Sequence, residues 1–176
     1  MYLLRIRELR AKRGAVPGKV LETATLRAFV AAGTILLGGS VLEFVLRGCK
    51  VNAMIFGAGL LCAIVSFWLR RNAIQALGRF WSLHVEIREQ HEFVENGPFR
   101  WVRHPTYLSM ILELLAGALM LNAFFTLAAV LVLFVPILLV RVHIEEAALI
   151  QKFGQLYRSY QQRTPAIFPY KWPIQR

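Results

Sequence analysis

The stretch VNAMIFGAGLLCAIVSFWL, residues 51–69, decides the class of fold because it contains no charged side chain. A helix of about 20 apolar residues crosses the hydrocarbon core of a bilayer, which is about 30 Å thick. Two further stretches reach this length: residues 26–46, whose charged side chains are Arg27 at its start and Glu43, and residues 123–140, interrupted only by Pro136. The sequence therefore predicts helices that span a membrane.

The composition of the whole chain agrees with this prediction. Of its 176 residues, 57% are hydrophobic, against roughly 45–50% in a soluble domain, and its mean hydropathy is +0.50. A shorter apolar stretch, residues 107–121, contains Glu113 and is taken as a further segment. We predict an all-α integral membrane protein, a single domain over residues 1–176, with about four transmembrane helices in two hairpins. The first hairpin covers residues 26–69.

The distribution of positive charge predicts the orientation in the membrane. The formal net charge is +11. Arginines and lysines gather before the first segment, between the second and the third, and after the fourth, whereas the remaining loops hold only Arg47 and Lys50. Because positive residues mark the cytoplasmic side, both termini and the loop of residues 70–105 are expected in the cytosol. Topology thus explains the charge, and we do not expect nucleic-acid binding.

The segments outside the predicted spans have patterns of their own. Residues 1–20 alternate basic and apolar side chains, which is typical of an amphipathic stretch at the membrane interface. No small-residue cleavage site follows, so we expect the first segment to remain as an anchor. Residues 85–88 alternate apolar and polar side chains, which favours an extended or interfacial segment. After residue 140 the helical pattern continues but becomes charged, so the last helix should extend into the cytosol.

Glycines and cysteines within the first hairpin have simple structural explanations. Gly57 and Gly59 are more typical of close packing between membrane helices than of a nucleotide-binding loop. Cys49 and Cys62 do not have the spacing of a metal or redox site. We therefore expect both cysteines to be unpaired.

Two polar clusters lie at the cytosolic ends of the predicted helices. One comprises residues 91–94, 97–99 and 103–107, and the other comprises Arg141, Glu145 and Glu146. Arg141 and Glu145 are four residues apart, so they share a helix face and can pair. His104-Pro105 suits a helix start, and Arg103 can reach lipid phosphates. Ionisable residues at membrane depth are nevertheless candidates for a functional site.

Taken together, these residues resemble a known family. The stretch GPFRWVRHPTY, residues 97–107, is followed by an apolar hairpin and then by Arg141 and the pair Glu145-Glu146. This order resembles the isoprenylcysteine carboxyl methyltransferase family, part of a wider group that includes phospholipid methyltransferases. Phe153-Gly154, Tyr157, Tyr160, Arg163 and Pro169 also resemble the C-terminal pattern of the family. The resemblance covers about residues 70–170, which would form the catalytic region with its cytosolic cofactor-binding loop.

The resemblance implies S-adenosylmethionine as the methyl donor and assigns residues to it. Its contacts would fall on His91, Glu92, Phe93, Val94, Phe99, His104, Pro105, Thr106, Tyr107 and Glu145. The arginine that contacts the substrate would be Arg141, which we also take as the catalytic residue. Phe99 replaces a tyrosine that is common in the family, so no hydroxyl is available at that position.

The chemistry of methyl transfer agrees with these residue types. A carboxylate such as Glu145 suits the ribose diol or the ammonium group of the donor, and the free N–H groups of a helix start favour an anion. Since the sulfonium already activates the methyl group, the enzyme mainly aligns the reactants. A carboxylate acceptor needs a cation to hold it, and the planar fork of Arg141 is suited to that task.

These expectations lead to one predicted function and several alternatives. We predict carboxyl O-methylation of an isoprenylcysteine-type acceptor, a lipid-like or prenylated substrate that enters from the bilayer. The alternatives in the same chemistry are phospholipid N-methylation and small-thiol S-methylation, each of which would need a proton removed. A membrane lipid reductase that uses NADPH, or a scaffold without catalysis, represents a different class. The short chain favours a prokaryotic cell membrane, or the endoplasmic reticulum membrane in a eukaryote.

Overall fold

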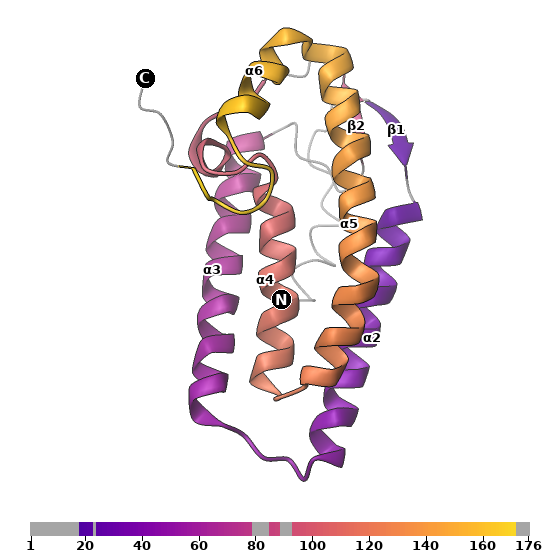
Figure 1. The fold of residues 1–176 in the computed structure, drawn as a ribbon, viewed down its shortest axis with the longest axis vertical. Helices are drawn as coiled ribbons and strands as arrows, with labels where there is room; N and C mark the ends of the chain where they lie inside the picture. The colour runs from indigo at the N-terminus through magenta and orange to yellow at the C-terminus, as the bar shows by residue number, and fades with distance from the viewer. Residues whose placement is uncertain (1–17, 23, 79–84, 89–92, 172–176) are drawn as a thin grey trace.

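The computed structural model describes residues 18–22, 24–78, 85–88 and 93–171. Four long helices run side by side in an elongated bundle (Figure 1): α2 Ala24–Leu46, α3 Ala53–Leu77, α4 Pro105–Met120 and α5 Phe124–Phe153. The shorter elements are β1 Gly18–Glu22, β2 Val85–Arg88, the 3₁₀ helix η2 Gly97–Arg100, and α6 Gln155–Arg163. The predicted continuation of the last helix beyond residue 140 is confirmed, because α5 is unbroken to Phe153.

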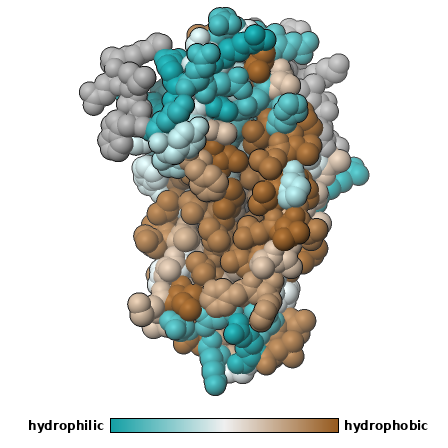
Figure 2. Space-filling view, viewed as in Figure 1, coloured by the Kyte–Doolittle hydropathy of each residue, from teal (hydrophilic) through white to brown (hydrophobic). Residues whose placement is uncertain are grey.

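The described helices confirm a mostly helical membrane fold. Three of them are long and apolar enough to cross a membrane: Arg27–Leu46, Ala53–Leu77 and Phe124–Phe153. The helix α4, at 16 residues, spans only about 24 Å, which is less than the hydrocarbon core of a bilayer. The expected fourth span is therefore a shorter apolar helix. Figure 2 shows the result as an apolar surface between two polar ends.

In both predicted hairpins, each helix packs along a helix of the other hairpin. The helix α3 packs along α4, and α2 packs along α5, so that α4 and α5 separate α2 from α3 (Figure 1). Gly59 makes the α3–α4 contact possible, since a Cβ atom there would lie 2.8 Å from Cγ of Met120. The predicted close packing is thus confirmed at Gly59, whereas Gly57 faces open space. The first hairpin is an open one, whose two helices flank the second hairpin.

A short antiparallel sheet of two strands accompanies the helices. The strands β1 and β2 pair with Gly18 opposite Arg88 and Glu22 opposite Val85. The two-residue alternation in β2 matches the period of a strand, so the extended segment predicted there is confirmed. Most of the amphipathic interfacial stretch predicted for residues 1–20 lies outside the described residues, and its last part belongs to β1.

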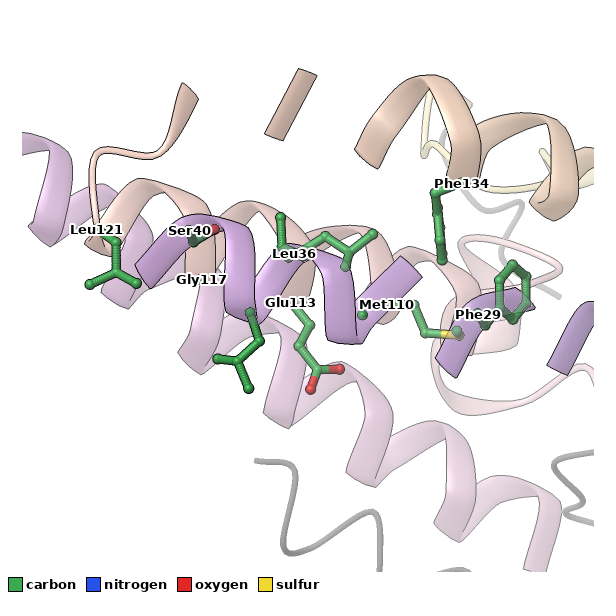
Figure 3. Close-up of a pocket in the computed structure, with 11 residues that line it drawn as sticks. Phe29, Leu36, Ser40, Met110, Glu113, Gly117, Leu121 and Phe134 are labelled. Atoms are coloured by element: carbon green, nitrogen blue, oxygen red, sulfur yellow. The ribbon is translucent and has the colours of Figure 1, made fainter. Parts of the chain in front are cut away.

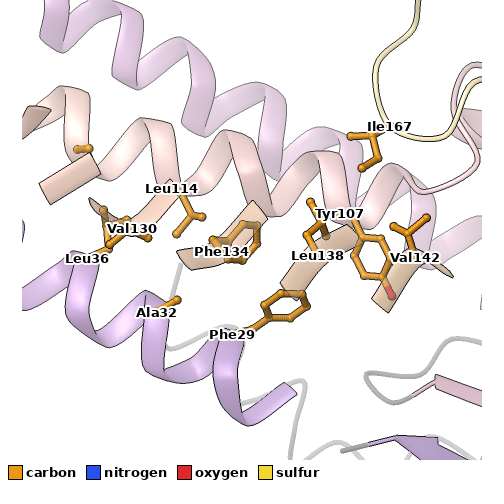
Figure 4. Packing of buried hydrophobic residues seen from close by; sticks show 11 residues of the cluster. Phe29, Ala32, Leu36, Tyr107, Leu114, Val130, Phe134, Leu138, Val142 and Ile167 are labelled. Carbon is orange, nitrogen blue, oxygen red and sulfur yellow. The ribbon is translucent and has the colours of Figure 1, made fainter. Parts of the chain in front are cut away.

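Both ends of the α2–α5 pair are fixed by specific contacts. In the core, the rings of Phe29 and Phe134 lie 4.8 Å apart, centre to centre (Figure 4). At the end farther from α6, the Glu43 carboxylate accepts hydrogen bonds from the backbone N–H and the hydroxyl of Thr126, both at 2.8 Å. The first N–H groups of a helix lack partners within it, so Glu43 on α2 caps the start of α5. This contact explains the acidic side chain within the first apolar segment.

Candidate active site at the polar end of the bundle

The polar residues singled out in the sequence gather where α4 begins. Pro105 occupies the first turn of α4 and His104 precedes it, which confirms the predicted helix start. The backbone N–H of Arg103 donates to the carbonyl of Pro165 at 2.9 Å, and that of His104 donates to Ala166 at 2.9 Å. The segment after α6 is therefore held against the start of α4, at one polar end of the molecule (Figure 2).

Arg141 is a buried cation on α5 with defined partners. Its side chain is 3% exposed. Its Nε donates to the hydroxyl of Tyr107 at 2.9 Å, and one terminal nitrogen donates to the hydroxyl of Thr25 at 2.8 Å. The rings of Phe29 and Tyr107 lie 5.6 and 5.9 Å from the guanidinium carbon. Such contacts offset part of the cost of removing a charge from water.

Tyr107 joins Arg141 to Glu145. The Tyr107 hydroxyl accepts from Arg141 and donates to the Glu145 carboxylate. The two charged residues that the sequence places on one helix face are thus linked through a side chain of α4. The Glu145 side chain is 33% exposed, against 15% for Glu146. Of these two neighbouring carboxylates, Glu145 is the more accessible to a ligand.

Glu146 is the centre of a second network, which ties several elements together. Its carboxylate accepts from Nε of Arg103 at 2.7 Å and from the side-chain amide of Gln161 at 2.7 Å, and it lies 3.0 Å from Nε2 of His104. Arg103 also donates to the carbonyls of Gln161 and Thr164. Arg103 therefore holds the C-terminal segment in place, which corrects the suggestion that it reaches out to lipid phosphates.

His104 lies between the two carboxylates. Its ring stacks on that of Tyr107, with centres 5.3 Å apart and planes inclined by 16°. Its Nδ1 lies 3.9 Å from Glu145, and its Nε2 faces Glu146. The ring is 3% exposed, so His104 positions Tyr107 and Glu145 from within the protein.

An aromatic cluster forms the adjoining wall. The ring of Phe93 lies 5.4 Å from that of Phe153 and 5.3 Å from that of Tyr160. The Tyr160 hydroxyl donates to the backbone carbonyl of Phe99 at 2.6 Å. Burial raises the pKa of Tyr160, so its hydroxyl keeps its proton and remains a donor at neutral pH. The Phe99 side chain is itself buried.

The model of the isoprenylcysteine carboxyl methyltransferase family matches residues 59–151, which is more than half of the chain. This chain belongs to that family. The match begins within α3 and includes α4 and most of α5. The family membership predicted from the sequence is thereby confirmed.

Individual relatives agree with the family match. Protein-S-isoprenylcysteine O-methyltransferase B of Arabidopsis thaliana is 31% identical over 138 residues, which cover 74% of this chain and 70% of the plant protein. YpbQ of Bacillus subtilis is 33% identical over 86 residues, 49% of each chain. The chain thus spans about half the length of the bacterial relative.

A solved structure has a similar fold. The eukaryotic intramembrane Ras methyltransferase, an isoprenylcysteine carboxyl methyltransferase, superposes with a TM-score of 0.70 over 85% of this chain and 55% of that one. The sequences are 24% identical, so this likeness concerns the fold. The mostly helical membrane fold expected from the sequence is confirmed by it.

The structure brings together most of the residues that the sequence assigned to the site. His104, Tyr107, Arg141 and Glu145 form one connected group, with Pro105 and Thr106 in the same turn of α4. Phe93, Val94 and Phe99 precede that turn and are partly or fully buried. His91 and Glu92 lie outside the described residues.

Sequence reasoning assigned no role to two residues of this region. Glu146 was visible next to Glu145 but carried no assignment, although a second carboxylate beside Glu145 was a usable signal. Thr25 bonds Arg141 from 116 residues away along the chain, and a lone threonine at the start of an apolar helix gives no signal in the sequence. Thr25 also lies outside the segment matched by the family.

Proposed function

We propose that this chain is an S-adenosylmethionine-dependent methyltransferase that methylates the carboxylate of an isoprenylcysteine-type acceptor at the membrane. The observation that carries the proposal is Arg141, a cation that is 3% exposed and adjoins the apolar core through Phe29. A guanidinium group binds a carboxylate through two parallel hydrogen bonds. Placed at this boundary, Arg141 suits an acceptor whose charged head is attached to an apolar tail.

The residues near Arg141 suit the methyl donor. When bound, S-adenosylmethionine supplies a methyl group that its sulfonium has already activated. Glu145 is accessible and is oriented by Tyr107 and His104, so it is suited to the ribose diol or the ammonium group. Phe93, which packs against Phe153 and Tyr160, would wall in the adenine.

In this proposal the two ligands bind next to each other. Arg141 and Glu145 share a face of α5, and Tyr107 contacts both of them. Arg141 would hold the acceptor carboxylate while Glu145 holds the donor, which aligns the nucleophilic oxygen with the methyl group. Alignment of this kind accounts for up to about 7–11 kcal/mol in the best-oriented systems. No proton has to be removed from a carboxylate acceptor at neutral pH.

The apolar surroundings support entry of the acceptor from the bilayer. A pocket between α2 and α4 adjoins the site through Phe29 and is lined mainly by apolar side chains (Figure 3). A lipid-like or prenylated tail would occupy this pocket while its head reaches Arg141. Neither an amine nor a neutral thiol accepts the two parallel hydrogen bonds that the Arg141 guanidinium offers, and this favours carboxyl methylation over N- or S-methylation.

The test is methyl transfer by the purified protein in lipid vesicles. Tritiated S-adenosylmethionine and a farnesylcysteine carboxylate are supplied, and the product is then treated with base. A methyl ester releases its label as methanol, whereas an N-methyl or S-methyl product retains it. We expect base-labile label. Base-stable label, or binding of NADPH without binding of S-adenosylmethionine, would contradict the proposal.

A further inference from the structure

The start of α4 and the last turns of α3 lie at one level of the bundle, next to the candidate active site. The Ser66 hydroxyl of α3 donates to the carbonyl of Ser109 on α4 at 2.7 Å, so these two residues are level with each other. The two helices run in opposite directions (Figure 1). At ~1.5 Å per residue, Arg71 is about 7.5 Å beyond Ser66, and Pro105 is about 6 Å beyond Ser109 toward the same end. Arg71 is therefore level with the first turn of α4.

Aromatic and basic side chains are exposed at this level. On α3, Trp68 is 62% exposed, and Arg71, three residues further along the same side, is also exposed. The C-terminal segment, residues 164–171, is held at the start of α4 by two backbone hydrogen bonds. It presents three exposed side chains, those of Phe168, Tyr170 and Lys171. Because Trp and Tyr are enriched where a membrane meets water, this composition is typical of a membrane interface.

The cations at this level are not neutralised by the protein around them. Neither Arg71 nor Lys171 takes part in an ion pair among the described residues. Lys171 donates from Nζ to the carbonyl of Gln162 at 3.0 Å and lies 5.6 Å from the centre of the Tyr170 ring, and both of these partners are uncharged. A lipid phosphate would supply the negative charge that these two side chains lack.

We propose that the C-terminal segment and the last turns of α3 bind anionic phospholipids of the leaflet on the side of the candidate active site. Positive side chains near a bilayer attract anionic lipids, each by about fivefold. The partner is a lipid surface and not a free phosphate ion, because the exposed rings of Trp68 and Tyr170 next to the cations suit the boundary of an apolar layer. This binding does not depend on the proposed function.

Lipid bound at this level would also stabilise the candidate active site. Ile167, which precedes Phe168, packs in the core cluster that contains Tyr107 (Figure 4). The C-terminal segment would thus be held by the core on one side and by lipid on the other. Loss of the lipid contact should loosen Ile167 and, with it, the packing around Tyr107.

The test compares two lipids at trace amounts. The purified full chain is placed in phosphatidylcholine vesicles that contain a small, equal fraction of phosphatidylglycerol or phosphatidylcholine labelled with dansyl on an acyl chain. Energy transfer from tryptophan to dansyl reports how far each lipid is enriched around the protein. We expect phosphatidylglycerol to be enriched by about fivefold or more, as for one or more cations near the surface. Equal transfer to the two lipids would overturn the proposal.

Single substitutions assign the preference to this level. Arg71→Gln and Lys171→Gln should each lower it by about fivefold. Arg158→Gln is the charge-matched control and should retain it. Arg158 is exposed in the first turn of α6, which follows Gly154, and Gly154 lies about 12 Å beyond Glu146 along α5. If Arg158→Gln loses as much as the other two variants, net charge alone attracts the lipid and the proposal is wrong.

Inorganic phosphate separates a lipid surface from a site for a simple anion. When phosphate is added at an ionic strength matched with chloride, the preference for phosphatidylglycerol should be the same in both salts. Loss of the preference in phosphate alone would identify a site for a free anion and would contradict the proposal.

Thermal unfolding tests the link to the core. The native chain should unfold at a higher temperature in vesicles rich in phosphatidylglycerol than in phosphatidylcholine, because a ligand that binds only the folded state stabilises it. Lys171→Gln should reduce this rise, whereas Arg158→Gln should not. An equal rise in all three chains would show that the C-terminal segment is not the lipid-binding element.

Discussion

At the scale of single residues, Tyr107 keeps Arg141 and Glu145 apart in fixed positions, although both lie on one face of α5. Its hydroxyl accepts a hydrogen bond from Arg141 and donates one to Glu145. The cation and the carboxylate are therefore held at fixed positions by a group from another helix. His104, stacked on Tyr107, fixes the plane of the ring.

Removal of the Tyr107 hydroxyl should weaken binding of the methyl donor without unfolding the protein. Tyr107→Phe retains the ring in the core but frees Glu145 from its donor, so we expect a loss of roughly 0.5–1.5 kcal/mol in the binding free energy. His104→Ala, which removes the stacked ring, should act in the same direction. Isothermal calorimetry with S-adenosylmethionine measures both. Unchanged affinity in the two variants would mean that these residues only form the start of α4 and do not help to bind the donor.

Thr25 should act as a positioning residue for Arg141. Thr25→Val removes the hydroxyl that accepts from the guanidinium at 2.8 Å and keeps the shape of the side chain. We expect KM for the acceptor to rise by about three- to tenfold, as for the loss of one typical hydrogen bond, with donor affinity unchanged. Thr25→Ser should restore normal kinetics. If Thr25→Ser and Thr25→Val behave alike, the hydroxyl has no such role.

At the scale of elements, the sequence predicts where the helices lie in the chain better than it predicts which elements pack against each other. Apolar length and the charged continuation after residue 140 were sufficient to predict α5, and His104-Pro105 was sufficient for the start of α4. The pairing of β1 with β2 and the packing of α2 against α5 join segments far apart in the chain. Local patterns carry no information about such contacts, which is why the link from Thr25 to Arg141 could not be predicted.

The C-terminal segment depends on Glu146. Glu146→Gln weakens the charged bonds to Arg103 and His104, so we expect a loss of about 1–3 kcal/mol in the free energy of unfolding and earlier cleavage near α6 in limited proteolysis. Glu95→Gln is the matched control, because Glu95 pairs with Arg163 where both side chains are 31% exposed, and such a pair contributes about 0–1 kcal/mol. Equal effects of the two changes would refute the central role of Glu146.

At the scale of the whole molecule, the apolar surface separates two polar ends that differ in content (Figure 2). One end carries the candidate active site, α6 and the C-terminal segment. The other carries the turn between α2 and α3, with exposed Cys49, and the cap that Glu43 provides for α5. The positive residues outside the helices favour a cytosolic position for the first of these ends.

Accessibility labelling tests this orientation. With a membrane-impermeant maleimide, native Cys49 should react from outside intact cells. Gln155→Cys, placed at the start of α6 in a chain whose Cys49 and Cys62 are replaced by serine, should react only from the cytosolic side. Reaction of both positions from one side would exclude the predicted orientation. Reversed labelling would put the candidate active site on the outer side of the membrane, away from a donor that is made in the cytosol.

The central claim is that Arg141 and Glu145 hold different ligands although they share a helix face. The most direct test measures donor affinity and turnover with a farnesylcysteine carboxylate in Arg141→Lys and in Glu145→Gln. We predict that Glu145→Gln loses about 1–3 kcal/mol of binding free energy for S-adenosylmethionine. Arg141→Lys should retain donor affinity and lose turnover, because an ammonium group does not reproduce the planar fork. Equal, small effects of both changes, or recovered activity in the swap of Arg141→Glu with Glu145→Arg, would contradict the claim.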